Sequence, residues 1–165
     1  MFQDIEERVD FIYRRFDRLA FGDDPQFFHR AIQNVDRTLA DAKGPHRDDI
    51  DHLYRLFEGL DQKTGGLLAH ISVIIAVLAI FYNNVSYGWQ VLLLIEMIAY
   101  VFLTFLCLRA IRMTTPRDDA GPVEAVDYVK LEYWKRRRYY NAANAFTIVA
   151  TAFVVFSLVC HQFFS

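Results

Sequence analysis

The sequence predicts an all-α membrane protein with three transmembrane helices and a layer of cytoplasmic helices. The first observation is that three apolar segments are long enough, as helices, to cross a hydrocarbon core of ~30 Å. These segments are Gly65–Tyr82, Trp89–Leu108 and Ala142–Phe164. The second observation is that Glu96 is the one charged residue that lies well inside any of them.

The third observation is the distribution of positive charge, which predicts the orientation. Of the eighteen Lys and Arg residues, ten precede the first apolar segment and eight lie between the second and the third. Basic residues near transmembrane helices are retained in the cytoplasm. We therefore expect the N-terminus and the 109–141 loop to be inside, and residues 83–88 and the C-terminus to be outside.

The overall composition is less informative. The mean hydropathy of +0.13 is that of a soluble protein, but the average hides the separation of polar from apolar stretches. A very apolar soluble bundle would need polar faces at helical spacing in the three segments, and none is visible. The net charge of −2 argues against a nucleic-acid binder. No metal-ligand spacing, cofactor motif or nucleophile–base pair is present, so we expect no metal, no cofactor and no enzyme.

Residues 1–60 read as a cytoplasmic region of three helices. The first carries apolar residues at heptad spacing, and these are Phe2, Ile5, Val9, Ile12, Phe16 and Leu19. It ends at Gly22–Pro25, where Pro25 occupies the first turn of the next helix. The apolar face of the second helix is Phe28, Ile32, Val35 and Leu39, and Gly44-Pro45 ends it. The third starts near Asp48-Asp49 and presents Ile50, Leu53, Tyr54, Phe57 and Leu60.

Two of the cytoplasmic helices are expected to continue into the membrane. No proline lies between Asp48 and Phe81, so the third helix runs into the transmembrane hairpin of residues 61–110, although Gly65-Gly66 could bend it. Residues 111–141 form a cytoplasmic loop and a basic helix. Pro122 starts that helix, which continues into the third transmembrane helix of residues 142–165. From Pro122 to Phe164 it would extend about 64 Å.

The cytoplasmic helices are too small to bury much apolar surface by themselves. They are expected to pack against residues 122–141, against another subunit, or against both. Their apolar stripes favour a homo-oligomer. The alternative is a monomer in which the stripes satisfy one another.

Glu96 is the first candidate for a functional residue. It lies about 10 Å inside Trp89, where an ionised carboxylate is costly unless it is neutralised, paired or in contact with water. His161 is the nearest polar candidate by depth, and Asn83 and Asn84 could also reach inward. One interpretation is a pore-lining or proton-responsive acid. The other is a neutral carboxyl hydrogen-bonded between helices as packing.

Two charged groups border the membrane segments. Asp61 and Lys63 lie at the inner end of the first segment, and residues two apart on a helix do not face each other. Each therefore pairs elsewhere, or both are simple flanking charges. Lys135-Arg136-Arg137-Arg138 precedes the third segment. Such a cluster binds anionic lipid headgroups, or, in the alternative, an anionic ligand such as a nucleotide.

The stretch Asp61–Ala69 (DQKTGGLLA) resembles the D-x-K-(A/T)-x-x-L-L pattern of one bacterial family. These are the small transmembrane effectors of Pycsar anti-phage systems, relatives of the SLATT-type membrane effectors. The layout is similar over roughly residues 50–165: a hairpin with a short outer link, then a basic helix that enters a final apolar segment. The resemblance implies a multi-pass protein of the bacterial inner membrane that responds to a cyclic nucleotide and compromises that membrane. No nucleotide-binding domain is recognisable.

Two functions are therefore expected. The first is an oligomeric inner-membrane effector of anti-phage defence that permeabilises the membrane on a cyclic-nucleotide signal. The second is a non-conducting membrane scaffold that organises a complex through its cytoplasmic helices.

Overall fold

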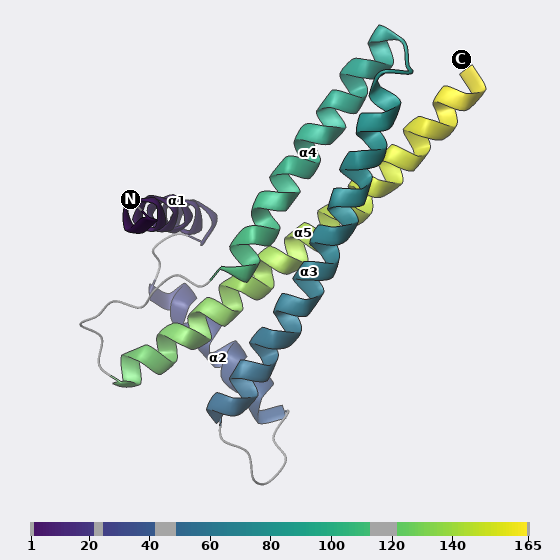
Figure 1. Ribbon diagram of the computed structural model, residues 1–165. Coiled ribbons are helices and arrows are strands. Elements are labelled where there is room, and N and C mark those ends of the chain that lie inside the picture. Colours follow the sequence, from purple (N-terminus) through teal and green to yellow (C-terminus); the bar gives the residue numbers. More distant parts are fainter. Residues whose placement is uncertain (1, 22–24, 42–48, 113–121, 165) are drawn as a thin grey trace. The chain divides into compact units, whose positions relative to one another are not determined.

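The computed structural model describes residues 2–21, 25–41, 49–112 and 122–164, and these residues are helical apart from a short turn at 83–86 and residue 112 (Figure 1). The helices are α1 (Phe2–Phe21), α2 (Pro25–Asp41), α3 (Asp49–Tyr82), α4 (Tyr87–Ile111) and α5 (Pro122–Phe164). Stretches of α3, α4 and α5 are long and apolar enough to cross a membrane. The all-α class and the three candidate spans are therefore confirmed.

The two continuous helices expected from the sequence are present. α3 runs from Asp49 through Gly65-Gly66 to Tyr82 without a break, and α5 runs from Pro122 to Phe164. α1 ends one residue before Gly22, and α2 begins at Pro25. Residues 22–24, Gly44-Pro45 and residues 113–121, which the sequence places in links, lie outside the described residues.

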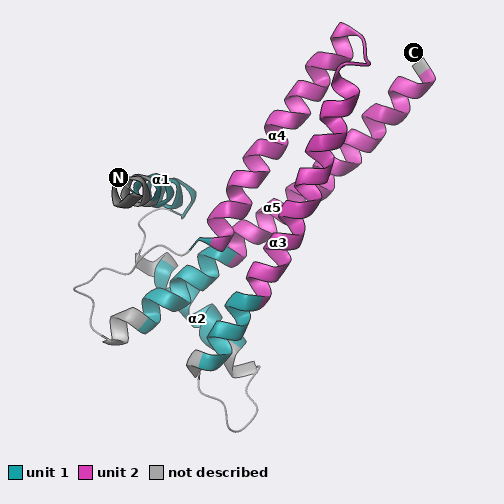
Figure 2. Cartoon of the chain, in the orientation of Figure 1, with its two compact units in different colours: residues 1–58, 112–136 teal, residues 59–111, 137–165 magenta. Residues whose placement is uncertain are grey.

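The chain divides into two compact units (Figure 2). Unit 1 comprises residues 1–58 and 112–136, and unit 2 comprises residues 59–111 and 137–165. Unit 1 therefore holds α1, α2 and the first parts of α3 and α5. Unit 2 holds α4 and the apolar remainders of α3 and α5.

Aromatic and charged residues of α5 organise the interior of unit 1. Trp134 meets Phe21 of α1 edge to face at 5.4 Å between ring centroids, and Tyr133 meets Phe57 of α3 at the same distance. Edge-to-face pairs of this kind add to the free energy gained from burying the rings. The expectation that residues 1–60 pack against the 122–141 extension is therefore confirmed.

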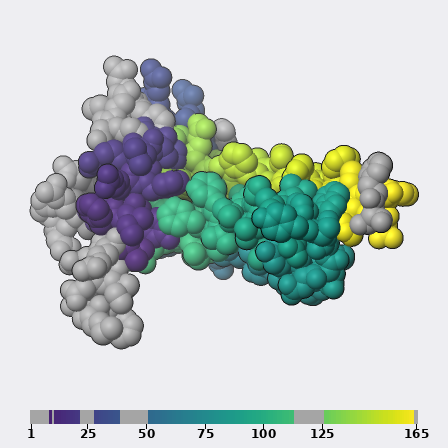
Figure 3. Space-filling view, turned by 90° about the horizontal axis from the view of Figure 1, so that it is seen from above, coloured from purple at the N-terminus to yellow at the C-terminus, as the bar shows by residue number. Residues whose placement is uncertain are grey.

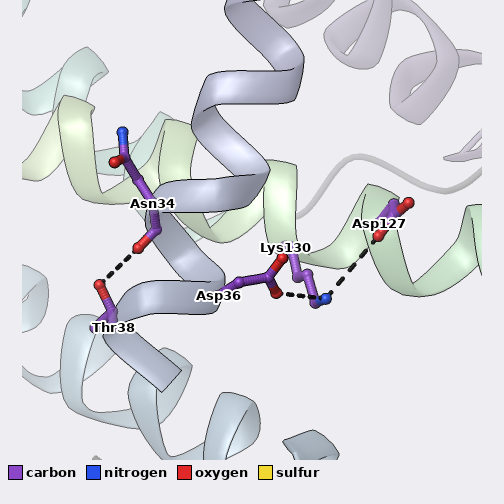
Figure 4. A network of polar contacts seen from close by, with 5 residues as sticks. All are labelled: Asn34, Asp36, Thr38, Asp127 and Lys130. Atoms are coloured by element: carbon purple, nitrogen blue, oxygen red, sulfur yellow. Dashed lines mark hydrogen bonds and ion pairs between the residues drawn. The ribbon is translucent and has the colours of Figure 1, made fainter. Parts of the chain in front are cut away.

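Ion pairs join α5 to α1 and to α2. Lys135 Nζ lies 3.4 Å from a carboxylate oxygen of Asp17 on α1. Lys130 Nζ lies 2.6 Å from Asp36 of α2 and 4.0 Å from Asp127 of α5 itself (Figure 4). Asp17 is buried, whereas the carboxylates of Asp36 and Asp127 are about half exposed.

The predicted apolar stripe of α1 is only partly the buried face. Ile12 is 54% exposed and Leu19 is 81% exposed, whereas Tyr13 and Asp17 are buried. The helix is rotated because its partners on the rest of unit 1 are polar as well as apolar. Asp17 pairs with Lys135, and the Tyr13 ring receives the guanidinium of Arg112 at 6.0 Å. Tyr54 of α3 is likewise exposed rather than buried.

Unit 2 is a bundle of three helices in which α3 and α4 form a hairpin. Hydrogen bonds close the tight link: the backbone N–H of Asn84 donates to the carbonyl of Phe81, and Gln90 Nε2 donates to the carbonyl of Tyr82. α5 packs along the hairpin (Figure 3). The side chains of Ile71 and Leu78 on α3, Tyr100 and Cys107 on α4, and Ala143 on α5 are fully buried in the centre.

Candidate functional site

Four contacts fix the register between α4 and α5, which run antiparallel. They pair Trp89 with His161, Glu96 with Ser157, Tyr100 with Thr151, and Arg109 with Tyr139. Positions therefore rise along α4 as they fall along α5, and the four pairs cover similar lengths of the two helices, from Trp89 to Arg109 and from His161 to Tyr139.

The ends of this register match the dimensions of a bilayer. Trp89 and Arg109 are twenty residues apart on α4, which corresponds to about 30 Å of helix and to the thickness of a hydrocarbon core. At one end the Trp89 ring meets His161 edge to face at 5.3 Å. At the other, the guanidinium of the fully buried Arg109 lies 5.5 Å from the ring centre of Tyr139. Amphipathic rings of this kind are typical of both membrane interfaces.

Glu96 lies in the interior of unit 2, 5% exposed. Its Oε1 accepts a hydrogen bond of 3.0 Å from the hydroxyl of Ser157. Its Oε2 is buried and has no hydrogen-bond partner among the residues that the structure describes. A buried oxygen of this kind costs free energy until it acquires a donor. Half of the carboxyl group is therefore satisfied within one chain, and half is not.

One helical turn further along α4, a second group of polar side chains joins all three helices. The hydroxyl of Tyr100 shares a hydrogen bond of 3.0 Å with Thr151 Oγ1 of α5, and the same oxygen lies 3.2 Å from Nε2 of His70 on α3. Tyr100 is fully buried, whereas His70 is exposed. Tyr100 lies about 16 Å from Trp89 along the helix, close to the middle of the span. We call these five residues, Glu96 and Ser157 with His70, Tyr100 and Thr151, the polar layer.

A groove adjoins the polar layer on one face of α4 and α5. It has a volume of about 360 Å³ and is lined by residues of α4 between Ile95 and Leu103 and of α5 between Phe146 and Phe153. Phe102, Phe146 and Phe153 contribute apolar walls, and Glu96 and Tyr100 are the lining residues with polar side chains. All of these residues belong to unit 2.

His161 is not the partner of Glu96, contrary to the suggestion from depth. It lies level with Trp89, one turn beyond Ser157 and about 10 Å further along the register than Glu96. Depth counted from the ends of the apolar segments suggested His161, whereas the packing of α4 against α5 decides which residues of the two helices lie level. Asn84 does not reach inward either, because its Nδ2 donates to the carbonyl of Ile80 in its own helix.

Asp61 and Lys63 lie within the uninterrupted helix α3, where Asp61 is half-buried and Lys63 is exposed. The adjacent Thr64 is fully buried, and its hydroxyl donates to the carbonyl of Leu60 at 2.7 Å. The motif therefore forms part of a continuous helical surface, in which its two charged residues have different environments.

The basic cluster of α5 is divided by its packing. Arg136 is 1% exposed, with its guanidinium 4.8 Å from the ring centre of Phe57. Lys135 pairs with Asp17 and lies 5.8 Å from the ring centre of Phe28. Both are interior residues of unit 1, so the lipid or ligand role predicted for them does not fit. Arg137 and Arg138 are exposed, and the predicted role stays a prediction for these two.

Ser157, Tyr100, Thr151 and His70 were not predicted from the sequence as partners in one site. Small polar residues are common in transmembrane helices and give no signal alone. A usable signal was the hairpin itself: His70 and Tyr100 lie at nearly equal distances from the 83–86 link, so an antiparallel pair places them level.

The polar layer offers carboxyl, hydroxyl, phenol and imidazole groups in an apolar surrounding. Such groups can hold an ion or a proton, or can bond to another helix. Among the described residues, no group of three or more His, Cys, Asp and Glu side chains could hold a metal ion. Comparison of the chain with protein-family models, with curated proteins and with solved structures gives no match.

Proposed function

We propose that this protein is an oligomeric effector of the bacterial inner membrane, which permeabilises that membrane on a cyclic-nucleotide signal as part of anti-phage defence. Three helices capable of spanning a bilayer support the membrane part of the proposal. The motif Asp61–Ala69 and its resemblance to the Pycsar-type effectors support the defence part. The proposal places the N-terminus inside and the C-terminus outside, which is the orientation that the distribution of Lys and Arg predicts.

The polar layer is the observation that carries the proposal. Glu96 keeps one buried oxygen without a donor, and His70 is exposed near the middle of the span. Each of these features would raise the free energy of a static bundle surrounded by lipid. Ionisable residues inside a membrane commonly mark ion paths and contacts between helices. A change in helix packing that brings Glu96 and His70 into contact with water would open a polar path through the bilayer.

The two units have different roles in this proposal. Unit 1 is held by aromatic pairs and ion pairs to α5, the helix that continues into the membrane. A signal received by the cytoplasmic helices therefore has a continuous helix along which to act. The exposed Arg137 and Arg138 are the candidates for binding the phosphate of a cyclic nucleotide or the headgroups of anionic lipids.

The test is inducible expression with a reading of membrane potential, with and without added cyclic nucleotides. Wild type should depolarise the membrane only with the active nucleotide, and Glu96→Gln should change the size or ion preference of that response while the protein still assembles. Thr104→Val is the matched control, because within the described part of the chain the Thr104 hydroxyl bonds to the carbonyl of Tyr100 in its own helix. Identical depolarisation in wild type and Glu96→Gln would remove Glu96 from the mechanism.

A non-conducting scaffold is the second candidate, and the exposed apolar face of α1 favours it. Phe11, Ile12 and Leu19 are more than half exposed, and exposed apolar clusters mark surfaces that bind other proteins. The same experiment separates the two functions. A protein that assembles in the membrane but never depolarises it, under any nucleotide, is the scaffold.

A further inference from the structure

The groove between α4 and α5 contains an acceptor without a donor. Glu96 is 5% exposed, lines the groove, and keeps Oε2 free of hydrogen bonds within the described part of the chain. Lipid chains can fill an apolar groove, but they bring no donor to this depth. An occupant that stabilises the groove must therefore be apolar and must also carry a hydrogen-bond donor opposite Glu96.

The same unit presents a second helical surface that has no neighbour within unit 2. On α3, opposite the buried Ile71 and Leu78, exposed residues recur at steps of three, four, three and four, which is the spacing of a heptad seam. These residues are Gly66, Ala69, Val73, Ala76 and Ile80. Small residues at such positions let two transmembrane helices approach closely. A Cβ built on Gly66 meets no atom within 4 Å. We call these five residues the α3 seam.

The groove and the α3 seam lie at the same level of the bundle. His70 and Tyr100 share the hydroxyl of Thr151 and are therefore level. Four residues further toward the hairpin link, Glu96 on α4 is level with residue 74 on α3, between Val73 and Ala76. A second copy crosses the bilayer in the same direction, so its α3 would run antiparallel to α4 and parallel to α5, as the α3 of the first copy does.

We propose that the groove receives the α3 seam of a second copy of this chain, and that this contact is the intramembrane interface of the homo-oligomer. The two surfaces are complementary in side-chain size. The large side chains of Phe102, Phe146 and Phe153 line the groove, and the α3 seam has glycine or alanine at three of its five positions. Ser72 adjoins the seam, is exposed, and carries a hydroxyl. Its hydroxyl donates to the carbonyl of Leu68. In the proposed contact, rotation about χ1 would turn this hydroxyl toward the Glu96 carboxyl of the neighbouring copy.

This contact has a consequence for the symmetry of the assembly. Each copy carries one groove and one seam on different surfaces, so the interface is heterologous. Heterologous contacts between copies that share one orientation form a ring when the rotation from each copy to the next closes, and an open row when it does not. A ring places the polar layer of each copy at an interface with the next copy. The inference rests on the homo-oligomer of the proposed function and names the surfaces that form it.

Bulky substitutions in the seam test the contact without disturbing the single chain. Gly66→Leu and Ala69→Leu add side chains where the folded chain leaves open space or an exposed surface, so helicity should be unchanged. Both should convert the oligomer to a smaller particle in mild detergent and in nanodiscs. Ala152→Leu is the matched control, since Ala152 is an exposed alanine at similar depth outside the seam and the groove, and it should assemble as wild type does.

Cross-linking identifies the surfaces directly. Two differently tagged copies are co-expressed, one with Val73→Cys and one with Phe153→Cys, both carrying Cys160→Ala; the native Cys107 is buried. Oxidation should join the two tags, because residue 153 of one copy faces residue 73 of the next. Ser72→Ala should weaken the assembly, and Ser72→Thr should restore it.

The failures are distinguishable. A disulfide between two copies of Val73→Cys, without any between positions 73 and 153, would mean that α3 pairs with α3 and would overturn the groove contact. An oligomer that forms normally with both seam variants would also overturn it and would leave the proposed function intact. A co-purified lipid found in the groove of the assembled protein would likewise overturn the groove contact and leave the proposed function intact. A monomer that depolarises the membrane would overturn both the contact and the oligomeric effector.

Discussion

Replacement of Ser157 by alanine should destabilise the three-helix bundle of unit 2 by an amount that the geometry sets. The hydroxyl of Ser157 is the donor to Glu96 Oε1 at 3.0 Å, and Oε2 already has no donor among the described residues. Ser157→Ala therefore leaves a buried carboxyl with neither oxygen bonded. Interhelical hydrogen bonds in membranes contribute about 0.6 kcal/mol on average, and an unsatisfied buried group costs about 1–3 kcal/mol. We expect a loss of about 1–2 kcal/mol, or about 5- to 30-fold in the unfolding equilibrium.

Glu96→Leu should be nearly neutral, within about 0.5 kcal/mol, because it removes the acceptor and keeps the volume. The Ser157 hydroxyl then bonds to a backbone carbonyl four residues earlier, as Thr64 and Thr147 do in this structure. The double variant Glu96→Leu/Ser157→Ala should also be nearly neutral. The two sites are therefore expected to show a coupling energy of about 1–2 kcal/mol.

The assay is unfolding by an increasing mole fraction of sodium dodecyl sulfate, at a detergent-to-protein ratio at which the protein is monomeric. Helicity is the signal that follows unfolding. Thr104→Val is the control, since among the described residues the hydrogen bond of the Thr104 hydroxyl stays within its own helix. A Ser157→Ala variant as stable as wild type would refute the reasoning. So would a double variant that loses the sum of the two single losses, because the two groups would then act independently.

Two further predictions concern unit 1 and the topology. Asp17→Ala should destabilise the protein by about 3 kcal/mol, because it leaves Lys135 without its buried partner. Asp36→Ala should destabilise it by less than about 1 kcal/mol, because Asp36 is half exposed. Thermal unfolding measures both losses of stability, and equal losses would contradict the difference in burial. Cysteine at Ser86 should react with a membrane-impermeant thiol reagent in intact cells, and cysteine at Asp51 only after the membrane is opened. Labelling of Asp51→Cys in intact cells would overturn the predicted orientation.

The sequence was most successful where a signal is local. Proline at the first turn placed the starts of α2 and α5, and Gly22 placed the end of α1. The lack of proline between Asp48 and Phe81 correctly indicated one helix across Gly65-Gly66. These features depend on backbone preferences of single residues, which operate before any tertiary contact forms.

The sequence was less successful where two helices must be aligned. Apolar periodicity named Ile12 and Leu19 as part of a buried stripe, and both are exposed. The rotation of α1 depends on the pairing of Asp17 with Lys135, more than a hundred residues apart in the chain. A hydrophobic pattern counts apolar residues and does not anticipate a buried ion pair.

The candidate site shows the same division. The sequence by itself determined that Glu96 is a carboxyl group inside an apolar helix, because hydropathy and helix length decide depth. Only the tertiary structure decided that Ser157 rather than His161 donates to it, and that Thr151 joins His70 to Tyr100. Only the structure, too, placed Glu96 beside a groove with one buried oxygen that has no donor among the described residues. Depth along a helix follows from counting residues at a fixed rise, whereas contact across helices depends on their register and rotation, which the packing of the whole bundle selects.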